Sequence, residues 1–286
     1  MRFAVLTPGL GEQKRYGALW RTGLARLAAR LGERGHTVAD SPWSAAKVGG
    51  CDAVLPLLAW GYHLDLPRWF AAVDALEVGG GPVFNPPSVL RWNADKIYLQ
   101  RLGDRGAPIV PTRFVERADA KAVAEAAAAF GTEEVVVKPR VSGGAHGTIK
   151  VAAGGSLEGG PEGAAMIQPF LSSVGTEGEL SMLVFGGRFS HALTKTARAG
   201  EFRVQPQYGG IIAAAEPDAG AFAVAEAVLA SVEEPLLYAR VDLIRDLEGA
   251  WRLMELELVE PYLFLDESPD GGLAFVEALE AAVRNA

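Results

Sequence analysis

The chain has 286 residues, of which 49% are hydrophobic, so it can bury a sizeable core, and its length favours two domains over one. Its net charge of -8 excludes nucleic acid as the main partner, because phosphate backbones require clustered Lys and Arg. The single cysteine, Cys51, excludes an intrachain disulfide and fits a reducing compartment. Because no apolar run suits a secretory signal or reaches the roughly 18 residues of a membrane span, we expect a cytoplasmic protein with no membrane partner.

The first half of the chain predicts alternating strands and helices. Apolar residues recur at i, i+4, i+7 and i+11 from Trp20 to Leu31, which marks one face of a helix ending near Gly35. Asp65 can serve as the N-cap of a second helix, with Pro67 tolerated in its first turn. In chain order we expect strands at 3–6, 53–57 and 111–115, and helices at 20–35, 65–76, 93–102 and 123–130.

Turn-rich and glycine-rich stretches divide the chain. GGGPVFNPPS (79–88) marks a boundary, and AAGGSLEGGPE (152–162) predicts a loop or hinge. Strand patterns dominate after it, at 166–170, 180–185, 202–204, 236–244 and 251–259, with helical periods at 221–232 and 273–283. The fold class that follows is an α/β front domain and a mixed α+β body.

The segment VVVKPRVSGGAHGTIKV (135–151) places Lys138 at the end of an apolar strand and a glycine-rich loop after it. A Walker loop has its glycines before the lysine, and a dinucleotide loop needs no lysine, so the segment matches neither. It still holds the parts of a phosphate site, namely a point charge and a run of backbone N–H donors from Ser142 to Thr148.

Two apolar segments with embedded charges, LLYARVDLIRD (236–246) and WRLMELELVEP (251–261), predict an antiparallel hairpin around Glu248–Gly249. In that register Asp242 lies opposite Glu255.

The same register places Arg240 opposite Glu257, and the strand period of two puts Glu255 and Glu257 on one face. Opposed like charges destabilise a sheet pair, and a buried unpaired carboxylate is costly. A divalent cation would neutralise the cluster, and Mg²⁺ is the metal that joins carboxylates to substrate phosphates. The alternative is an exposed hairpin face whose charges pair with Arg240 and solvent.

From about Asn93 to Pro261 the ordered motifs resemble the ATP-grasp superfamily. NADK (93–96) is similar to its first lysine segment, VVVKP with SGGAHGT to its second lysine and mobile phosphate loop, and MIQPFL (166–171) to its adenine linker. The stretches 177–195 and 200–210 resemble the β-pair that lines the nucleotide, and VDL with MELE resembles the metal carboxylates.

Segments 57–70, 84–102 and 106–116 resemble a narrower group that includes a cyclo-ligase of cycloserine biosynthesis. Two departures stand out. Glu257 replaces the asparagine of the family's E-x-N-x-x-P pattern, with an extra residue before Pro261, and Gly61 replaces the aspartate of W-D-Y. The family resemblance therefore extends to this chain, whereas the substrate of the relatives does not.

The resemblance implies three regions: a front domain (1–88), a subdomain with the lysines and glycine-rich loop (89–164), and a subdomain with the metal site (165–286), the last two clasping ATP. It implies nucleotide contacts from Lys96, Lys138, Ser142, Gly143, Gly144, Gly147, Thr148, Gln168, Pro169, Phe170, Leu171 and Glu179. It implies Mg²⁺, with Mn²⁺ as the alternative metal, on Asp242, Glu255 and Glu257, and catalytic or substrate contacts from Arg203, Lys195 and Arg240.

The implied reaction phosphorylates a small, amino-acid-like carboxylate, after which an amine displaces phosphate to give an amide or a ring, with release of ADP. Ring closure and ligation between two molecules both remain open, as does a homodimer. A second hypothesis is an ATP-binding interaction protein without turnover. Individual residues also have simpler interpretations: Lys96 as an exposed helix lysine, and Arg203 as the surface partner of Glu201.

Overall fold

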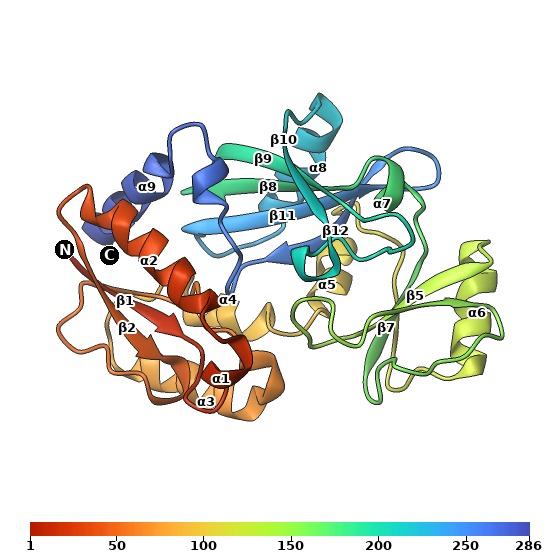
Figure 1. Ribbon diagram of the computed structural model, residues 1–286, viewed down its shortest axis with the longest axis horizontal. Helices are drawn as coiled ribbons and strands as arrows, with labels where there is room; N and C mark the ends of the chain where they lie inside the picture. The colour runs from red at the N-terminus through yellow and green to blue at the C-terminus, as the bar shows by residue number, and fades with distance from the viewer.

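The computed structural model describes all 286 residues and contains three β-sheets (Figure 1). The first is a parallel sheet of three strands in the order β2-β1-β3. Its elements are β1 (Arg2–Thr7), α1 (Gln13–Tyr16), α2 (Leu19–Gly32), β2 (Thr37–Pro42), β3 (Ala53–Leu55) and α3 (Leu66–Val78). The side chain of Asp65 accepts a hydrogen bond from the Arg68 amide, so the expected N-cap of the second helix is confirmed.

The second sheet has four strands in the order β4-β7-β5-β6, with α6 packed against it. It forms the lobe at the right of Figure 1. Its elements are β4 (Arg113–Val115), α6 (Ala120–Phe130), β5 (Glu134–Pro139), β6 (Ile149–Ala152) and β7 (Ala165–Pro169). The expected glycine-rich loop connects β5 to β6, so both of its ends are held by strands of one sheet.

The third sheet has five antiparallel strands in the order β10-β9-β8-β11-β12. Its strands are β8 (Glu179–Phe185), β9 (Arg188–Thr196), β10 (Ile211–Ala215), β11 (Tyr238–Arg245) and β12 (Trp251–Glu257). The associated helices are α4 (Pro87–Trp92), α5 (Tyr98–Asp104), α7 (Ser173–Thr176), α8 (Ala219–Ala230) and α9 (Leu273–Asn285). No helix combines the length and the apolar character that a membrane span requires.

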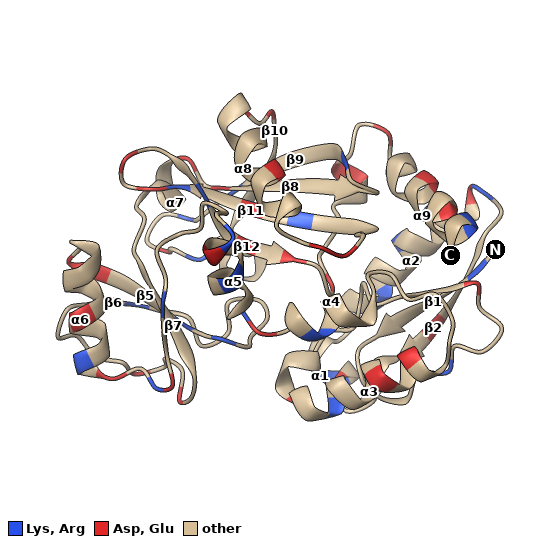
Figure 2. Ribbon diagram, turned by 180° about the vertical axis from the view of Figure 1, so that it is seen from behind, with Lys and Arg blue, Asp and Glu red and all other residues tan.

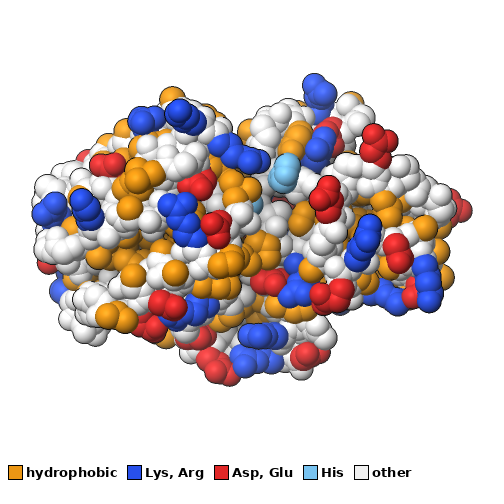
Figure 3. Space-filling model, turned by 90° about the horizontal axis from the view of Figure 1, so that it is seen from below, with side chains coloured by type: hydrophobic (Ala, Val, Ile, Leu, Met, Phe, Trp, Pro, Cys, Tyr) orange, Lys and Arg blue, Asp and Glu red, His pale blue; other side chains and the backbone are white.

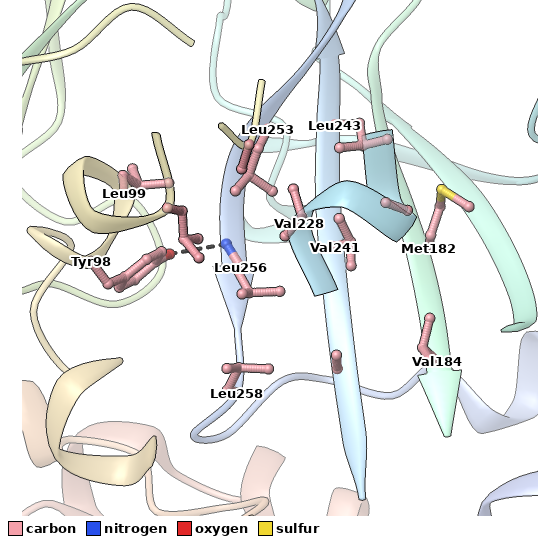
Figure 4. Packing of buried hydrophobic residues seen from close by; sticks show 14 of the residues in the cluster. Tyr98, Leu99, Met182, Val184, Val228, Val241, Leu243, Leu253, Leu256 and Leu258 are labelled. Atoms are coloured by element: carbon pink, nitrogen blue, oxygen red, sulfur yellow. Dashed lines mark hydrogen bonds between the residues drawn. The ribbon is translucent and has the colours of Figure 1, made fainter. Parts of the chain in front are cut away.

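One face of this five-stranded sheet is apolar along its length. Val241, Leu243 and Leu256 pack there against α5 and α8, and the Tyr98 hydroxyl accepts a 2.9 Å hydrogen bond from the Leu256 amide (Figure 4). At one end of the opposite face, Phe185 and Tyr238 pack against α9 and the front sheet. Burial of both faces fixes the strand register, because a shift by one residue would bring every side chain to the wrong face.

The expected helix over 93–102 is wrong over 93–97 and confirmed over 98–102. Residues 93–97 form turns, and the helix begins at Tyr98. Asn93 is buried, and its side chain donates to the Leu256 carbonyl and accepts from the Leu258 amide. Tertiary hydrogen bonds to β12 thus override the helical period.

The expected strand over 202–204 is also wrong, since this segment pairs with no other strand. The amides of Phe202 and Arg203 both donate to the carboxylate of Glu201, at 2.8 and 3.1 Å. A neighbouring side chain therefore takes the donors that a strand partner would have used.

Asn85 ties the front domain to the large sheet. It is fully buried, its amide nitrogen donates to the carbonyls of Tyr238 and Leu258 at 2.9 Å, and its amide oxygen accepts from the Leu237 amide at 2.8 Å. One side chain thus satisfies backbone groups at the start of β11 and just after β12. No strand pairing supplies those hydrogen bonds.

We expect Asn85→Ala to lower the free energy of unfolding by about 3 kcal/mol, because it leaves several buried backbone groups unpaired. Urea unfolding followed by circular dichroism measures the change. The matched control is Asn285→Ala at the exposed end of α9, which should change the value by less than about 0.5 kcal/mol. Equal stability of the two variants would contradict this role of Asn85.

Candidate active site

The face of the large sheet that packs on the front domain changes character along its length. At one end it carries Leu183, Phe185 and Tyr238, which are buried. At the other end the same strands carry charged residues: Glu179 on β8, Lys195 on β9, Arg240 and Asp242 on β11, and Glu255 and Glu257 on β12. Acidic and basic segments meet near α5 and β12 (Figure 2).

The expected hairpin register is confirmed at the charged end. Asp242 pairs with Glu255 and Arg240 with Glu257. The register shifts by one residue between Asp242 and Leu243, where Met254 is the extra residue of a bulge. The thioether of Met254 accepts a 3.1 Å hydrogen bond from the ammonium group of Lys138, which reaches across from β5.

Asp242 is the most enclosed carboxylate of the site, at 2% exposure. Its oxygens accept hydrogen bonds from the guanidinium of Arg240 at 2.8–3.1 Å, from Lys195 at 3.4 Å and from the Ser181 hydroxyl. Burial alone would raise the pKa of Asp242, but Arg240 and Lys195 hold it well below its usual value. Asp242 is therefore ionised at neutral pH.

The other carboxylates each contact a cation. Lys195 forms an ion pair with Glu179. The pKa of Lys195 is raised, because the neighbouring carboxylates outweigh the effect of burial. Lys96 lies 3.1 Å from Glu255, and Arg240 also contacts Glu257. The sheet face thus alternates opposite charges over a short distance, which stabilises buried ions only when every partner is present.

The raised pKa of Glu257 indicates that the carboxylates around it outweigh the neighbouring cations. Burial, together with the nearby Glu255 and Asp242, raises its pKa to about 7 in spite of Arg240. Burial and Glu257 likewise raise the pKa of Glu260 well above its usual value. The carboxylates therefore repel one another where they face β5.

This donor set fits a divalent cation. The side chains of Glu255 and Glu257 are 32% and 29% exposed and are adjacent on one strand face, so both carboxylates are only partly enclosed. In the present arrangement no three carboxylates enclose a position for a metal. A dication would relieve the repulsion that raises the pKa of Glu257, and carboxylate oxygens are the ligands that Mg²⁺ prefers.

The glycine-rich loop lies beside these groups. Lys96 donates to the carbonyl of Ser142 at 3.0 Å, and the side-chain amide of Gln207 donates to the carbonyl of Gly144 at 3.2 Å. Gly144 and Gly147 have φ values of 60° and 69°, a backbone conformation that favours glycine. Thr148, at the end of the loop, is buried. Viewed from below, the surface has a notch between the lobe that contains β5 and β7 and the rest of the molecule (Figure 3).

The residues expected at the adenine lie together at the end of β7. Gln168 is 1% exposed, its amide nitrogen donates to the Thr112 hydroxyl at 2.9 Å, and its oxygen has no partner. Pro169 ends the strand, the Lys150 ammonium lies 4.3 Å from the ring centroid of Phe170, and Leu171 is buried. An unpaired buried acceptor of this kind suits a donor such as an exocyclic amine.

Arg203, expected at the phosphoryl group, contacts none of the charged residues on the sheet face. Its guanidinium forms two hydrogen bonds to Glu201, at 2.7 and 3.1 Å, and stacks 3.7 Å from the ring centroid of Tyr208. The pairing with Glu201 matches the simpler interpretation of the sequence.

Four residues beside the site were not predicted from the sequence: His63, Gln207, Met254 and Glu260. Glu260 occupies the extra position before Pro261, so a departure from the family pattern marked it. The others carry no pattern of their own, because segments far apart in the sequence, namely two short 3-10 helices and the bulge of β12, bring them to the site. An apolar cavity of about 50 Å³ between α2 and segment 261–266 contains none of the expected site residues.

Comparisons with known proteins agree with this fold. No protein-family model matches the chain. It is 32% identical over 222 residues to the cycloserine biosynthesis protein DcsG of Streptomyces lavendulae, spanning 69% of this chain and 72% of that protein. It is 26% identical over 251 residues to a glutathione synthetase of Ralstonia nicotianae, spanning 83% of this chain and 74% of that protein.

Solved structures extend the likeness to the whole chain. The crystal structure of D-cycloserine synthetase DcsG aligns with a TM-score of 0.81 and 26% identity, over 99% of this chain and 100% of that chain. The D-alanine–D-alanine ligase of Bacillus anthracis aligns with a TM-score of 0.70 over 99% of this chain and 96% of that chain. At 15% identity, the latter likeness shows the fold alone.

The fold and these relatives define an ATP-dependent ligase. The chain belongs to the ATP-grasp superfamily. The expected superfamily, fold class and enzyme class are therefore confirmed.

We expect Lys195→Met to lower the free energy of unfolding by about 3–5 kcal/mol, because it leaves Asp242 and Glu179 with one cation fewer in a buried setting. Chemical unfolding at pH 7 measures the loss. The control Lys121→Met, whose ammonium is exposed and 3.8 Å from Glu125, should change stability by less than about 0.5 kcal/mol. Adding Glu179→Gln to Lys195→Met should recover part of the loss, and a further decrease would contradict the pairing.

Proposed function

We propose that the protein activates a small, amino-acid-like carboxylate with ATP and transfers the acyl group from its acyl phosphate to an amine. The observation that carries the proposal is the meeting of Lys96, Lys138 and the loop Ser142–Thr148 with the carboxylates of β11 and β12. Phosphates and carboxylates repel, so a site that presents cations and carboxylates together suits a nucleotide bound through a metal.

Mg²⁺ is the metal we assign to Asp242, Glu255 and Glu257. A related ATP-grasp ligase, PsnB, was crystallised with Mg and ADP, which supports the choice. When bound, the ion would neutralise charge that develops on the phosphoryl oxygens. Asp242 is ionised and held by Arg240 and Lys195, so it offers a fixed oxygen, whereas Glu255 and Glu257 are the accessible ligands.

The protein's own groups position the phosphates. Lys138 is enclosed and has a thioether as its partner, so a phosphate would be a better partner than the one it contacts here. Burial lowers the pKa of Lys138, and an anion beside it would reverse this shift. Lys96 is tied to the loop through the Ser142 carbonyl, so it couples phosphate binding to loop position.

Adenine contacts are assigned to Gln168, Pro169, Phe170 and Leu171. The unpaired amide oxygen of Gln168 supports this assignment. Glu179 holds Lys195 in place, and we assign Arg240 and Lys195 to contact with the phosphoryl group or the substrate carboxylate, because both are cations beside the proposed metal ligand Asp242. Arg203 would have to leave Glu201 before it could contact a phosphoryl group.

The relatives support the proposed substrate class. One is named for cycloserine biosynthesis and another as glutathione synthetase, so both ring closure and ligation between molecules stay open for this chain. Positioning and charge neutralisation suffice for either reaction, because the nucleotide supplies the activated phosphoryl group. A homodimer stays a prediction.

Release of ADP in the presence of Mg²⁺, measured against amino acids, dipeptides and ureido or hydroxylamine derivatives, tests the proposal. We expect one carboxylate to stimulate release and one amine to increase it further. Tight ATP binding without stimulation by any carboxylate would favour the alternative, an ATP-binding interaction protein.

We expect Glu255→Gln to lower kcat by at least about 100-fold while the unfolding midpoint stays within about 2 °C, since Glu255 is about one-third exposed and contacts only Lys96. Steady-state ADP release and thermal unfolding measure the two quantities. Glu248→Gln, in the exposed turn of the same hairpin, is the control and should keep normal turnover. Near-normal turnover of Glu255→Gln would remove Glu255 from the metal site.

A further inference from the structure

His63 reaches the glycine-rich loop from the front domain. It lies in a short 3-10 helix, Tyr62–Leu64, which follows Gly61 in the left-handed conformation with φ 89°. Tyr62 turns inward, where its ring lies 5.2 Å from that of Trp69, and it is buried in the front-domain core. His63, the next residue, is directed instead toward Gly143, the second residue of the loop.

The contact between His63 and the loop is close. A Cβ atom built on Gly143 would lie 2.8 Å from Cε1 and 3.0 Å from Nδ1 of the imidazole, so the ring packs directly on the glycine backbone. Nδ1 is buried and has no hydrogen-bond partner. A buried ring nitrogen without a partner is costly, and it indicates a position where a ligand supplies the missing hydrogen bond.

The charges around His63 indicate the sign of that ligand. The pKa of His63 is lowered to about 4. Burial is the largest cause, and the positive charges of Lys96 and Arg15 and the neighbouring His146 add to it. The imidazole is therefore neutral at pH 7, and its surroundings are cationic. An anion is the ligand that such surroundings favour, and a neutral imidazole can donate to it from Nδ1.

Lys96 faces the same part of the loop. Its ammonium donates to the carbonyl of Ser142, the residue before Gly143, at 3.0 Å. An anionic oxygen beneath Ser142 and Gly143 would therefore meet an ammonium from one side and the Nδ1–H of His63 from the other. Under the proposed function, the loop covers the outer phosphates of the nucleotide, so this oxygen belongs to the terminal phosphoryl group.

We propose that His63 donates a hydrogen bond from Nδ1 to an oxygen of the terminal phosphoryl group held beneath Ser142 and Gly143. The inference rests on the proposed function and extends it, since it gives the front domain a direct contact with the transferred group. It makes the front domain sensitive to whether the third phosphate is present.

Binding of two nucleotides tests the inference: AMP-PNP, which has the terminal phosphoryl group, and ADP, which lacks it, both with Mg²⁺ and measured by titration calorimetry. We expect His63→Ala to raise the Kd for AMP-PNP by about tenfold or more and to leave the Kd for ADP within about twofold. His63→Asn carries an amide N–H near the place of Nδ1 and should restore most of the affinity. His63→Gln, whose amide lies near the place of Nε2, should not.

Three results would overturn the inference. Equal losses for AMP-PNP and ADP would assign His63 to general packing, and unchanged affinity for both would remove it from the nucleotide site. A raised KM for the carboxylate with unchanged AMP-PNP affinity would assign Nδ1 to the substrate carboxylate. The proposed function fails separately, if the unmodified protein binds neither nucleotide. Thermal unfolding of each variant shows whether it is folded.

Discussion

The balance of charge around Asp242 is the constraint on which the rest of the site depends. A carboxylate at 2% exposure is tolerated in a sheet only because Arg240, Lys195 and Ser181 all contact it. Arg240 and Lys195 are in turn held by Glu257 and Glu179, so the ion pairs extend over four strands. Removing any charged member leaves its neighbours with one counter-ion fewer.

This network shares its sheet face with an apolar contact surface. Arg240 and Tyr238 are two residues apart on β11 and point to the same side, yet Tyr238 packs in the core with the front domain and Arg240 meets carboxylates. The front domain is therefore fixed at one end of the face and bounds the charged end. The position of His63 against Gly143 follows from this arrangement, because the front domain carries His63 to the loop.

Much of the fold and the centre of the site could be predicted from the sequence, for identifiable reasons. The turn expected at Glu248–Gly249 predicted the pairs of Asp242 with Glu255 and of Arg240 with Glu257 on β11 and β12. The bulge at Met254 lies beyond those pairs and leaves no mark in the pattern. The helical periodicity mispredicted residues 93–97, because long-range hydrogen bonds of the Asn93 side chain determine the local structure there. The expected strand at Arg203 does not form, because a nearby carboxylate, Glu201, takes the backbone donors.

Gly61 shows how the front domain differs from relatives that carry W-D-Y. A Cβ atom at this position would lie 2.8 Å from Cγ of Glu12 and 3.2 Å from the ring of Tyr16, so the volume of an aspartate side chain is already filled. The Cβ and Cγ atoms of Glu12, in the segment after β1, thus occupy the space that a side chain at position 61 would need. An aspartate here would have to displace Glu12, and the φ of 89° would strain its backbone, so the front domain is built around the absence of a side chain at this position.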